Sequence, residues 1–184
     1  MSRYELTKTV VMIGMMGAGK TAVGTALARL LNAPFIDSDH ELESAANSTI
    51  AEIFEQFGEA FFRKKESQVL ARLLEGKPCV LSTGGGAFLR AENRDLIAEK
   101  GLAVWLRAED DLLWSRVRHK TTRPLLQVPD PRAKLSEMLR AREPFYAQAG
   151  LVVDADANYS VQDMAEKVLQ ALAAQPASIL KKAA

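Results

Sequence analysis

The sequence predicts an α/β fold in which helical crossovers join parallel strands. Two observations support it: short apolar runs alternate with longer segments of helical periodicity, and a glycine-rich motif separates the first run from the first helix. The expected strands are Val10–Ile13, Phe35–Asp37, Pro78–Ser82, Leu102–Leu106 and Leu151–Val153. The expected helices are Lys20–Leu31, Asp39–Ala46, Ile50–Phe57, Glu59–Glu75, Arg90–Lys100, Glu109–Val117, Arg132–Ala147 and Val161–Ala173. Ligands of such folds gather at the carboxyl ends of the strands.

The composition is that of one soluble globular domain. The chain has 184 residues, of which 48% are hydrophobic and 26% charged, enough for a substantial core. A net charge of +1 gives no indication of nucleic acid or an acidic membrane as a partner. The single cysteine, Cys79, excludes an intrachain disulfide and a zinc cluster, and we expect it to be a small core residue. There is no signal-peptide pattern, and the apolar runs are too short to span a bilayer, so a cytoplasmic protein is predicted.

Residues 14–21 read Gly-Met-Met-Gly-Ala-Gly-Lys-Thr, a full match to the phosphate-binding pattern G-x-x-x-x-G-K-[ST]. The motif lies between the first strand and the first helix, which is the context it requires. Its backbone N–H groups and the helix N-terminus would hold phosphate. Lys20 would reach the β- and γ-phosphates, and the Thr21 hydroxyl would ligate Mg²⁺. A glycine-rich turn with an exposed lysine is the alternative, but the match in this context favours nucleotide binding.

Two carboxylates, Asp37 and Asp39, follow the second strand. If the strand geometry persists, both face the same side at a separation of about 7 Å. One could then serve Mg²⁺ and the other a substrate. The alternative is that Asp39 is only the N-cap of the next helix.

Two other segments suit a small ligand. Three consecutive glycines at 84–86 follow the third strand; they are entropically costly, but they allow a backbone to approach a ligand closely, the alternative being a flexible turn. Arg63 and Glu66 are three residues apart on a helix and can pair. A solvated ion pair is the alternative. Because Phe61 and Phe62 are adjacent, a partly buried site is favoured, where Arg63 could bind a ligand carboxylate.

The stretch 112–129 contains no Asp or Glu. Its basic residues are Arg116, Arg118, Lys120 and Arg123, together with His119. Residues 121–131 hold three of the seven prolines and are predicted to form a loop. A basic loop without acidic residues suits contact with ATP phosphates and transient closure; a solvated loop is the alternative. Arg142 lies near a helix end that Pro144 interrupts, where stabilisation of the helix dipole is the alternative role. The tail 175–184 is expected to be frayed.

In this order, the segments resemble those of the shikimate kinase family. The resemblance extends from Val10 to Ala173. Its motifs are Gly-Met-Met-Gly-Ala-Gly-Lys-Thr at 14–21, Asp-Ser-Asp at 37–39, Phe-Arg-x-x-Glu at 62–66, Gly-Gly-Gly at 84–86, Arg-Pro-Leu-Leu at 123–126 and Arg-x-Pro-x-Tyr at 142–146. The resemblance implies a P-loop kinase: a three-layer α/β sandwich with a five-stranded parallel sheet. It also implies a single kinase domain over 1–184, with a helical substrate-binding region near 39–66 and a mobile lid near 118–130.

The implied reaction is phosphorylation of the 3-hydroxyl of shikimate by MgATP, a step of chorismate and aromatic amino-acid biosynthesis. The implied ATP-binding residues are Gly17, Ala18, Gly19, Lys20, Thr21, Ala22, Arg116 and Arg123, with Arg116 stacked on adenine. The implied substrate-binding residues are Asp39, Arg63, Gly84, Gly85, Gly86 and Arg142, with the two arginines on the carboxylate. Asp39, Lys20 and Arg123 would be catalytic. Thr21 would hold Mg²⁺, assisted through water by Asp37. We expect a monomer that binds shikimate and ATP, and neither nucleic acid nor membrane.

Ser82-Thr83-Gly84 stands where the general phosphate-loop scheme often has a second metal-binding Asp, which leaves the metal to Thr21 and Asp37. Two other functions compete with this assignment. A gluconate kinase would share the phosphate loop and the lid, but Arg63 with Arg142 and the triple glycine argue against it. A nucleotide-dependent regulatory module usually carries an effector domain, for which 184 residues leave no room.

Overall fold

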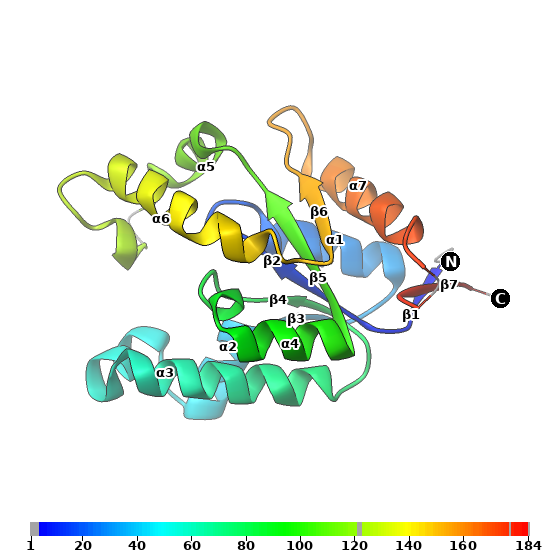
Figure 1. Cartoon of the computed structure of the whole chain (residues 1–184), viewed down its shortest axis with the longest axis horizontal. Coiled ribbons are helices and arrows are strands. Elements are labelled where there is room, and N and C mark those ends of the chain that lie inside the picture. Colours follow the sequence, from blue (N-terminus) through cyan, green and yellow to red (C-terminus); the bar gives the residue numbers. More distant parts are fainter. Residues whose placement is uncertain (1–3, 121–122, 177, 184) are drawn as a thin grey trace.

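A five-stranded parallel sheet in the order β3-β4-β2-β5-β6 forms the centre of the protein (Figure 1). The structure is a computed structural model, and it describes residues 4–120, 123–176 and 178–183. The strands are β2 (Thr9–Ile13), β3 (Phe35–Asp37), β4 (Val80–Ser82), β5 (Gly101–Arg107) and β6 (Leu151–Asp154). Every neighbouring pair is parallel. The predicted α/β fold with five parallel strands is therefore confirmed.

Helices cover both faces of this sheet. They are α1 (Lys20–Leu31), α2 (Ser38–Ala46), α3 (Ile50–Leu74), α4 (Ala91–Lys100), α5 (Asp110–Val117), α6 (Pro131–Tyr146) and α7 (Val161–Ala173), with 3₁₀ turns η1 (Ala87–Leu89) and η2 (Pro124–Leu126). Helix α1 packs against α7, and α3 packs against α4. The two pairs lie on opposite sides of the sheet in Figure 1, so the three layers that the sequence predicts are present. No helix in the described part of the chain is long and apolar enough to cross a membrane.

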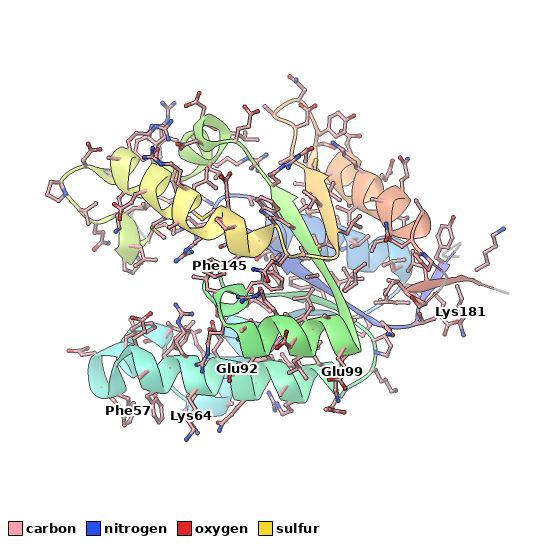
Figure 2. The ribbon with its side chains drawn as sticks, in the orientation of Figure 1. Phe57, Lys64, Glu92, Glu99, Phe145 and Lys181 are labelled. Carbon is pink, nitrogen blue, oxygen red and sulfur yellow. The ribbon has the colours of Figure 1, made fainter. Side chains whose placement is uncertain are left out.

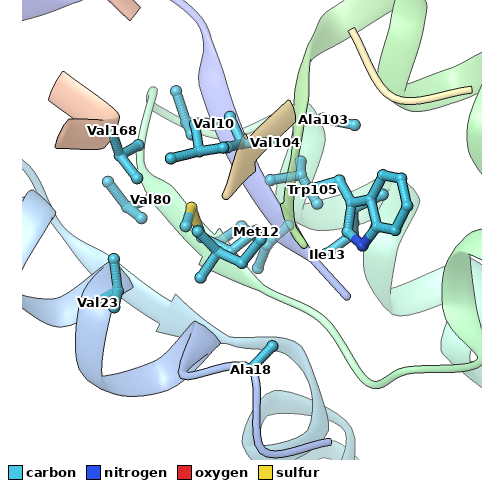
Figure 3. Packing of buried hydrophobic residues seen from close by; sticks show 14 of the residues in the cluster. Val10, Met12, Ile13, Ala18, Val23, Val80, Ala103, Val104, Trp105 and Val168 are labelled. Carbon is cyan, nitrogen blue, oxygen red and sulfur yellow. The ribbon is translucent and has the colours of Figure 1, made fainter. Parts of the chain in front are cut away.

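The central strand explains why the sheet is stable. All five residues of β2 are buried, as expected for a strand covered on both faces. Figure 3 shows Val10 and Met12 of β2 between Val80 of β4 and Val104 of β5. Full burial of each such side chain contributes about 1.5–3 kcal/mol. The apolar run that predicts β2 is thus also the centre of the core.

Helix α3 divides at Gly58, the boundary at which the sequence predicts two separate helices. Its N-terminus is closed by a capping box between Thr49 and Glu52. At Gly58 the backbone leaves the helical region, with φ 80° and ψ 175°, so the helix kinks at the predicted boundary. Phe57 and Lys64 project outward from α3 (Figure 2). The opposite face, which carries Phe62 and Glu66, is buried.

The two ends of the chain pair with each other. Strand β1 (Tyr4–Leu6) is antiparallel to β7 (Leu180–Lys182), and the two lie side by side in Figure 1. Ile179 and Leu180 are buried against the core. The expectation of a frayed tail at 175–184 is therefore wrong for residues 178–183. Residues 180–182 are held by β1 at the other end of the chain, and such a distant partner leaves no local signal in the sequence.

Candidate active site

The carboxyl ends of the strands open onto one cavity of about 1290 Å³. This volume exceeds the usual range for one small ligand and is large enough for two. The cavity brings together every predicted site residue: Gly17, Ala18, Gly19, Lys20, Thr21, Ala22, Asp37, Asp39, Arg63, Gly84, Gly85, Gly86, Arg116, Arg123 and Arg142. The loop after β2 with the first turn of α1, the junction of β3 and α2, and the glycines after β4 supply most of them.

The phosphate loop presents backbone donors toward the cavity. Gly19 precedes α1 with a φ of 97°, which a residue with a Cβ rarely adopts. No side chain in the described residues caps α1, so its first N–H groups are available to an anion. The Lys20 ammonium donates to the carbonyl oxygens of Gly14 (2.7 Å) and Met15 (2.9 Å). Burial, and then the charge of Arg123, lower the pKa of Lys20 to about 8, so it still carries a positive charge near neutral pH.

Arg116 reaches the loop from α5. Its Nη1 donates to the carbonyl oxygens of Gly17 (3.0 Å) and Ala18 (3.2 Å). A Cβ on Gly17, whose φ is 82°, would lie only 2.7 Å from Val117 Cγ1. The loop is therefore held against α5, and its conformation depends on a contact between segments far apart in the chain.

Asp37 and Asp39, the two carboxylates at the junction of β3 and α2, make different contacts. The strand ends at Asp37, and this residue is the N-cap of α2. Its Oδ1 accepts from the backbone N–H groups of Asp39 (2.9 Å) and His40 (3.3 Å). The strand geometry does not persist to Asp39, and the capping role considered for Asp39 belongs to Asp37. Both residues nevertheless line the cavity.

Asp39 is thereby free to act on a ligand. Burial raises its pKa to about 6, and the negative charges of Asp37 and Glu66 act in the same direction, while Lys20 opposes them. At neutral pH the carboxylate is mostly ionised, and it is a stronger base than an ordinary aspartate. Such a pKa suits a group that accepts a proton from a hydroxyl.

Each residue of the triple glycine makes room for one functional side chain. A Cβ built on Gly84 would lie 3.1 and 3.2 Å from the two carboxylate oxygens of Asp39. A Cβ on Gly85 would lie 2.8 Å from Arg142 Nη1, and a Cβ on Gly86 would overlap the guanidinium of Arg63. The segment is therefore a place of close approach rather than a flexible turn.

The ion pair between Arg63 and Glu66 is not a solvated one. Arg63 Nη1 donates to Glu66 Oε1 over 2.8 Å, and the Glu66 side chain is 3% exposed. Glu59 lies on the solvent side, 3.5 Å from Arg63 Nε. Burial raises the pKa of Glu66, and the hydrogen bond and charge of Arg63 partly offset it. Glu66 thus holds Nη1 of the guanidinium, and both Nη atoms lie against Gly86.

Residues 16–173 match the family model described as shikimate kinase (SKI). The chain belongs to the shikimate kinase family. The shikimate kinase of Cereibacter sphaeroides is 64% identical over 172 residues, covering 94% of this chain and 86% of that protein. That of Ruegeria pomeroyi is 62% identical over 168 residues, with coverages of 91% and 86%.

Solved structures lead to the same family. A shikimate kinase from Acinetobacter baumannii in complex with shikimate superposes with a TM-score of 0.84 and 41% identity, covering 90% of this chain and 93% of that chain. A gluconokinase from Sinorhizobium meliloti 1021 has a TM-score of 0.55 and 19% identity, covering 92% of this chain and 93% of that chain. At that identity the second match shows the fold alone, so nothing in it favours gluconate over shikimate.

The segment predicted to be a lid of the kinase is described except at 121–122, which lie outside the described residues. Arg123 precedes η2 and lines the cavity. Lys120 lines it as well. Asp130 caps α6 by accepting from the Ala133 N–H over 3.0 Å. The basic stretch thus borders the same cavity as Lys20.

Sequence reasoning missed one wall of the cavity and one contact to the triple glycine. The wall follows β6 and consists of Ala155, Tyr159, Ser160, Val161 and Met164. Its place after the last parallel strand is the signal that could have found it. The contact is the hydroxyl of Tyr146, a residue in the 142–146 motif, which donates to the Gly85 carbonyl oxygen over 2.6 Å.

Proposed function

We infer that this chain transfers the γ-phosphoryl group of ATP to the 3-hydroxyl of shikimate, giving ADP and shikimate 3-phosphate. The observation that carries the inference is the meeting, in one cavity of a shikimate kinase family member, of a phosphate loop with two arginines and a carboxylate. A related kinase of the same fold is solved in complex with shikimate. The enzyme is a phosphotransferase with an alcohol acceptor and supplies the pathway to chorismate and the aromatic amino acids.

The nucleotide occupies the half of the cavity beside α1. The loop amides from Gly17 to Ala22 and the ammonium of Lys20 bind its phosphates. Arg116, already bonded to the loop carbonyls, stacks on adenine, and the apolar wall after β6 completes the base site. Arg123 contacts the transferring phosphate when the segment 118–130 closes over it. Positive charge placed in this way stabilises the charge that spreads over the phosphoryl oxygens.

Shikimate occupies the half beside the triple glycine. The guanidinium groups of Arg63 and Arg142 bind its carboxylate, and the backbone of Gly85 and Gly86 donates to it. Asp39 binds the ring hydroxyls and accepts the proton of the attacking one. The room that Gly84 leaves for the Asp39 carboxylate supports this role.

The donor set fits Mg²⁺. The Thr21 hydroxyl and the Asp37 carboxylate are hard oxygen donors that line the cavity. Oδ1 of Asp37 accepts from two backbone N–H groups, which fixes the carboxylate so that its other oxygen can bind a metal-bound water. The described residues contain no group of three or more His, Cys, Asp or Glu able to hold a metal, so the remaining ligands would come from ATP and water. When bound, Mg²⁺ neutralises charge on the β- and γ-phosphates.

A coupled assay of ADP release tests the function. Shikimate, gluconate and nucleoside monophosphates are compared as acceptors, each with and without Mg²⁺. We expect Mg²⁺-dependent turnover of shikimate and little of the others. Faster turnover of gluconate or a nucleotide would refute the assignment. We also propose that the enzyme acts as a monomer in the cytoplasm, where ATP is available; sedimentation at assay concentration tests the oligomeric state.

A further inference from the structure

The hydroxyl of Tyr146 connects α6 to the triple glycine. Tyr146 is the last residue of α6 and is fully buried. Its hydroxyl donates to the Gly85 carbonyl oxygen over 2.6 Å, and its ring packs on Trp105 of β5 with the ring centroids 5.8 Å apart. Since a buried tyrosine hydroxyl needs a partner, this bond fixes the position of the Gly85 backbone relative to α6.

Arg142 meets the same glycine from the same side. It lies four residues before Tyr146, so the two side chains share a face of α6. A Cβ on Gly85 would lie 2.8 Å from Arg142 Nη1 and 3.5 Å from Tyr146 Oη. Burial raises the pKa of Tyr146, and the positive charge of Arg142 only partly offsets this effect. The hydroxyl therefore keeps its proton and donates to Gly85, while the Arg142 guanidinium approaches the same glycine.

We propose that Tyr146 is a positioning residue for shikimate: its hydroxyl, between the Arg142 guanidinium and the Gly85 carbonyl, holds both in the arrangement that receives the substrate carboxylate. This inference rests on the proposed function, in which Arg142 and the backbone of Gly85 bind that carboxylate. A bidentate contact depends on the orientation of the planar guanidinium. Holding that orientation before shikimate arrives strengthens binding, because less order is lost on association.

The variant Tyr146→Phe isolates the hydroxyl. It keeps the ring and its packing on Trp105 and removes only the hydroxyl with its hydrogen bond to the Gly85 carbonyl oxygen. We expect the dissociation constant of shikimate, titrated without nucleotide, and its KM to rise about two- to twelvefold, the effect of losing one hydrogen bond. The KM of ATP should change less than twofold.

A matched control separates positioning from stability. Thr9 also has a buried hydroxyl, which accepts from the Cys79 N–H over 3.3 Å at the amino end of β2, and Thr9 does not line the cavity. Thr9→Val should lower the unfolding midpoint about as much as Tyr146→Phe does, since each removes one buried hydroxyl, and it should leave the KM of shikimate unchanged. If Tyr146→Phe also leaves shikimate binding unchanged, Tyr146 is a core residue only and the proposal is wrong.

A double-mutant cycle tests whether Tyr146 acts through its neighbour. If it does, Tyr146→Phe combined with Arg142→Ala should weaken shikimate binding by clearly less than the product of the two single losses. Losses that multiply fully would overturn the proposal. If Arg142→Ala alone keeps normal shikimate affinity, the carboxylate site itself is assigned wrongly. If instead Arg142→Ala weakens shikimate binding and Tyr146→Phe leaves it unchanged, the carboxylate site stands and only the positioning role of Tyr146 is wrong.

Discussion

Gly86→Ala should displace Arg63 without disturbing the backbone. Gly86 has φ −92° and ψ −15°, which any residue adopts, so the added methyl group introduces no backbone strain. The methyl carbon would overlap the Arg63 guanidinium, with Cζ only 2.7 Å away. Non-bonded carbon atoms need about 3.5–4.0 Å. The guanidinium must therefore move by roughly 1 Å, which the flexible side chain of Arg63 allows.

The magnitude follows from what Arg63 does. Because a flexible side chain moves, we expect the free energy of unfolding to fall by no more than about 1 kcal/mol, the lower end of the range for added bulk. Shikimate binding should suffer more, since a charge-assisted bidentate contact is worth roughly 1.5–3 kcal/mol. Loss of that contact corresponds to a ten- to hundredfold weaker affinity. Nucleotide binding should be unaffected, because the phosphate loop is untouched.

The assay combines shikimate kinetics at saturating ATP, a nucleotide titration and thermal unfolding. Gly76→Ala is the matched control, since a Cβ there meets only the Leu73 carbonyl oxygen, at 3.3 Å. We expect the control to behave as wild type and Arg63→Ala to reproduce the shikimate defect of Gly86→Ala. A Gly86→Ala enzyme with a shikimate KM within twofold of wild type would refute the reasoning that the glycine exists to admit Arg63.

Three further substitutions test the remaining roles. Lys20→Ala should lower kcat on the order of a thousandfold, because it removes a preorganised charge from the phosphoryl group; a loss below tenfold in steady-state kinetics would contradict this. Asp39→Asn should keep ATP binding, measured by titration, but lose turnover; near-normal turnover would show that Asp39 is not the base. Because burial raises the pKa of Asp39 to about 6, ionisation destabilises the folded state as pH rises from about 4 through 6. Asp39→Asn should therefore have the same unfolding temperature as wild type near pH 4 and a higher one at pH 8, where its free energy of unfolding should exceed that of wild type by up to about 3 kcal/mol. Equal unfolding temperatures at pH 8 would count against the raised pKa. Arg123→Ala should abolish turnover while shikimate affinity without nucleotide stays near wild type, and intact turnover would exclude a role at the phosphates.

The sequence by itself determined the features that arise from consecutive residues. The apolar run at 10–13 predicts a buried strand, since a strand covered on both faces needs an apolar side chain at every position, and all of β2 is buried. Helix α1 has the predicted bounds, Lys20–Leu31, because the phosphate motif ends where the helix begins. The break at Gly58 is visible because glycine alone readily adopts the φ of 80° found there. Local chemistry therefore suffices for the sheet, most helices and the nucleotide-binding loop.

Only the tertiary structure decided which distant segments contact one another at the site. That Asp37 rather than Asp39 caps α2 depends on where β3 ends, and β3 ends with its last pair to β4, Asp37 opposite Ser82. The pairing of Gly86 with Arg63, and of Gly85 with Tyr146, joins segments far apart in the chain. Such contacts form because the carboxyl ends of parallel strands meet at one edge of the sheet, while β1 and β7 pair across the two termini. Their free energy comes from burial and hydrogen bonds between segments, and a one-dimensional pattern does not contain that information.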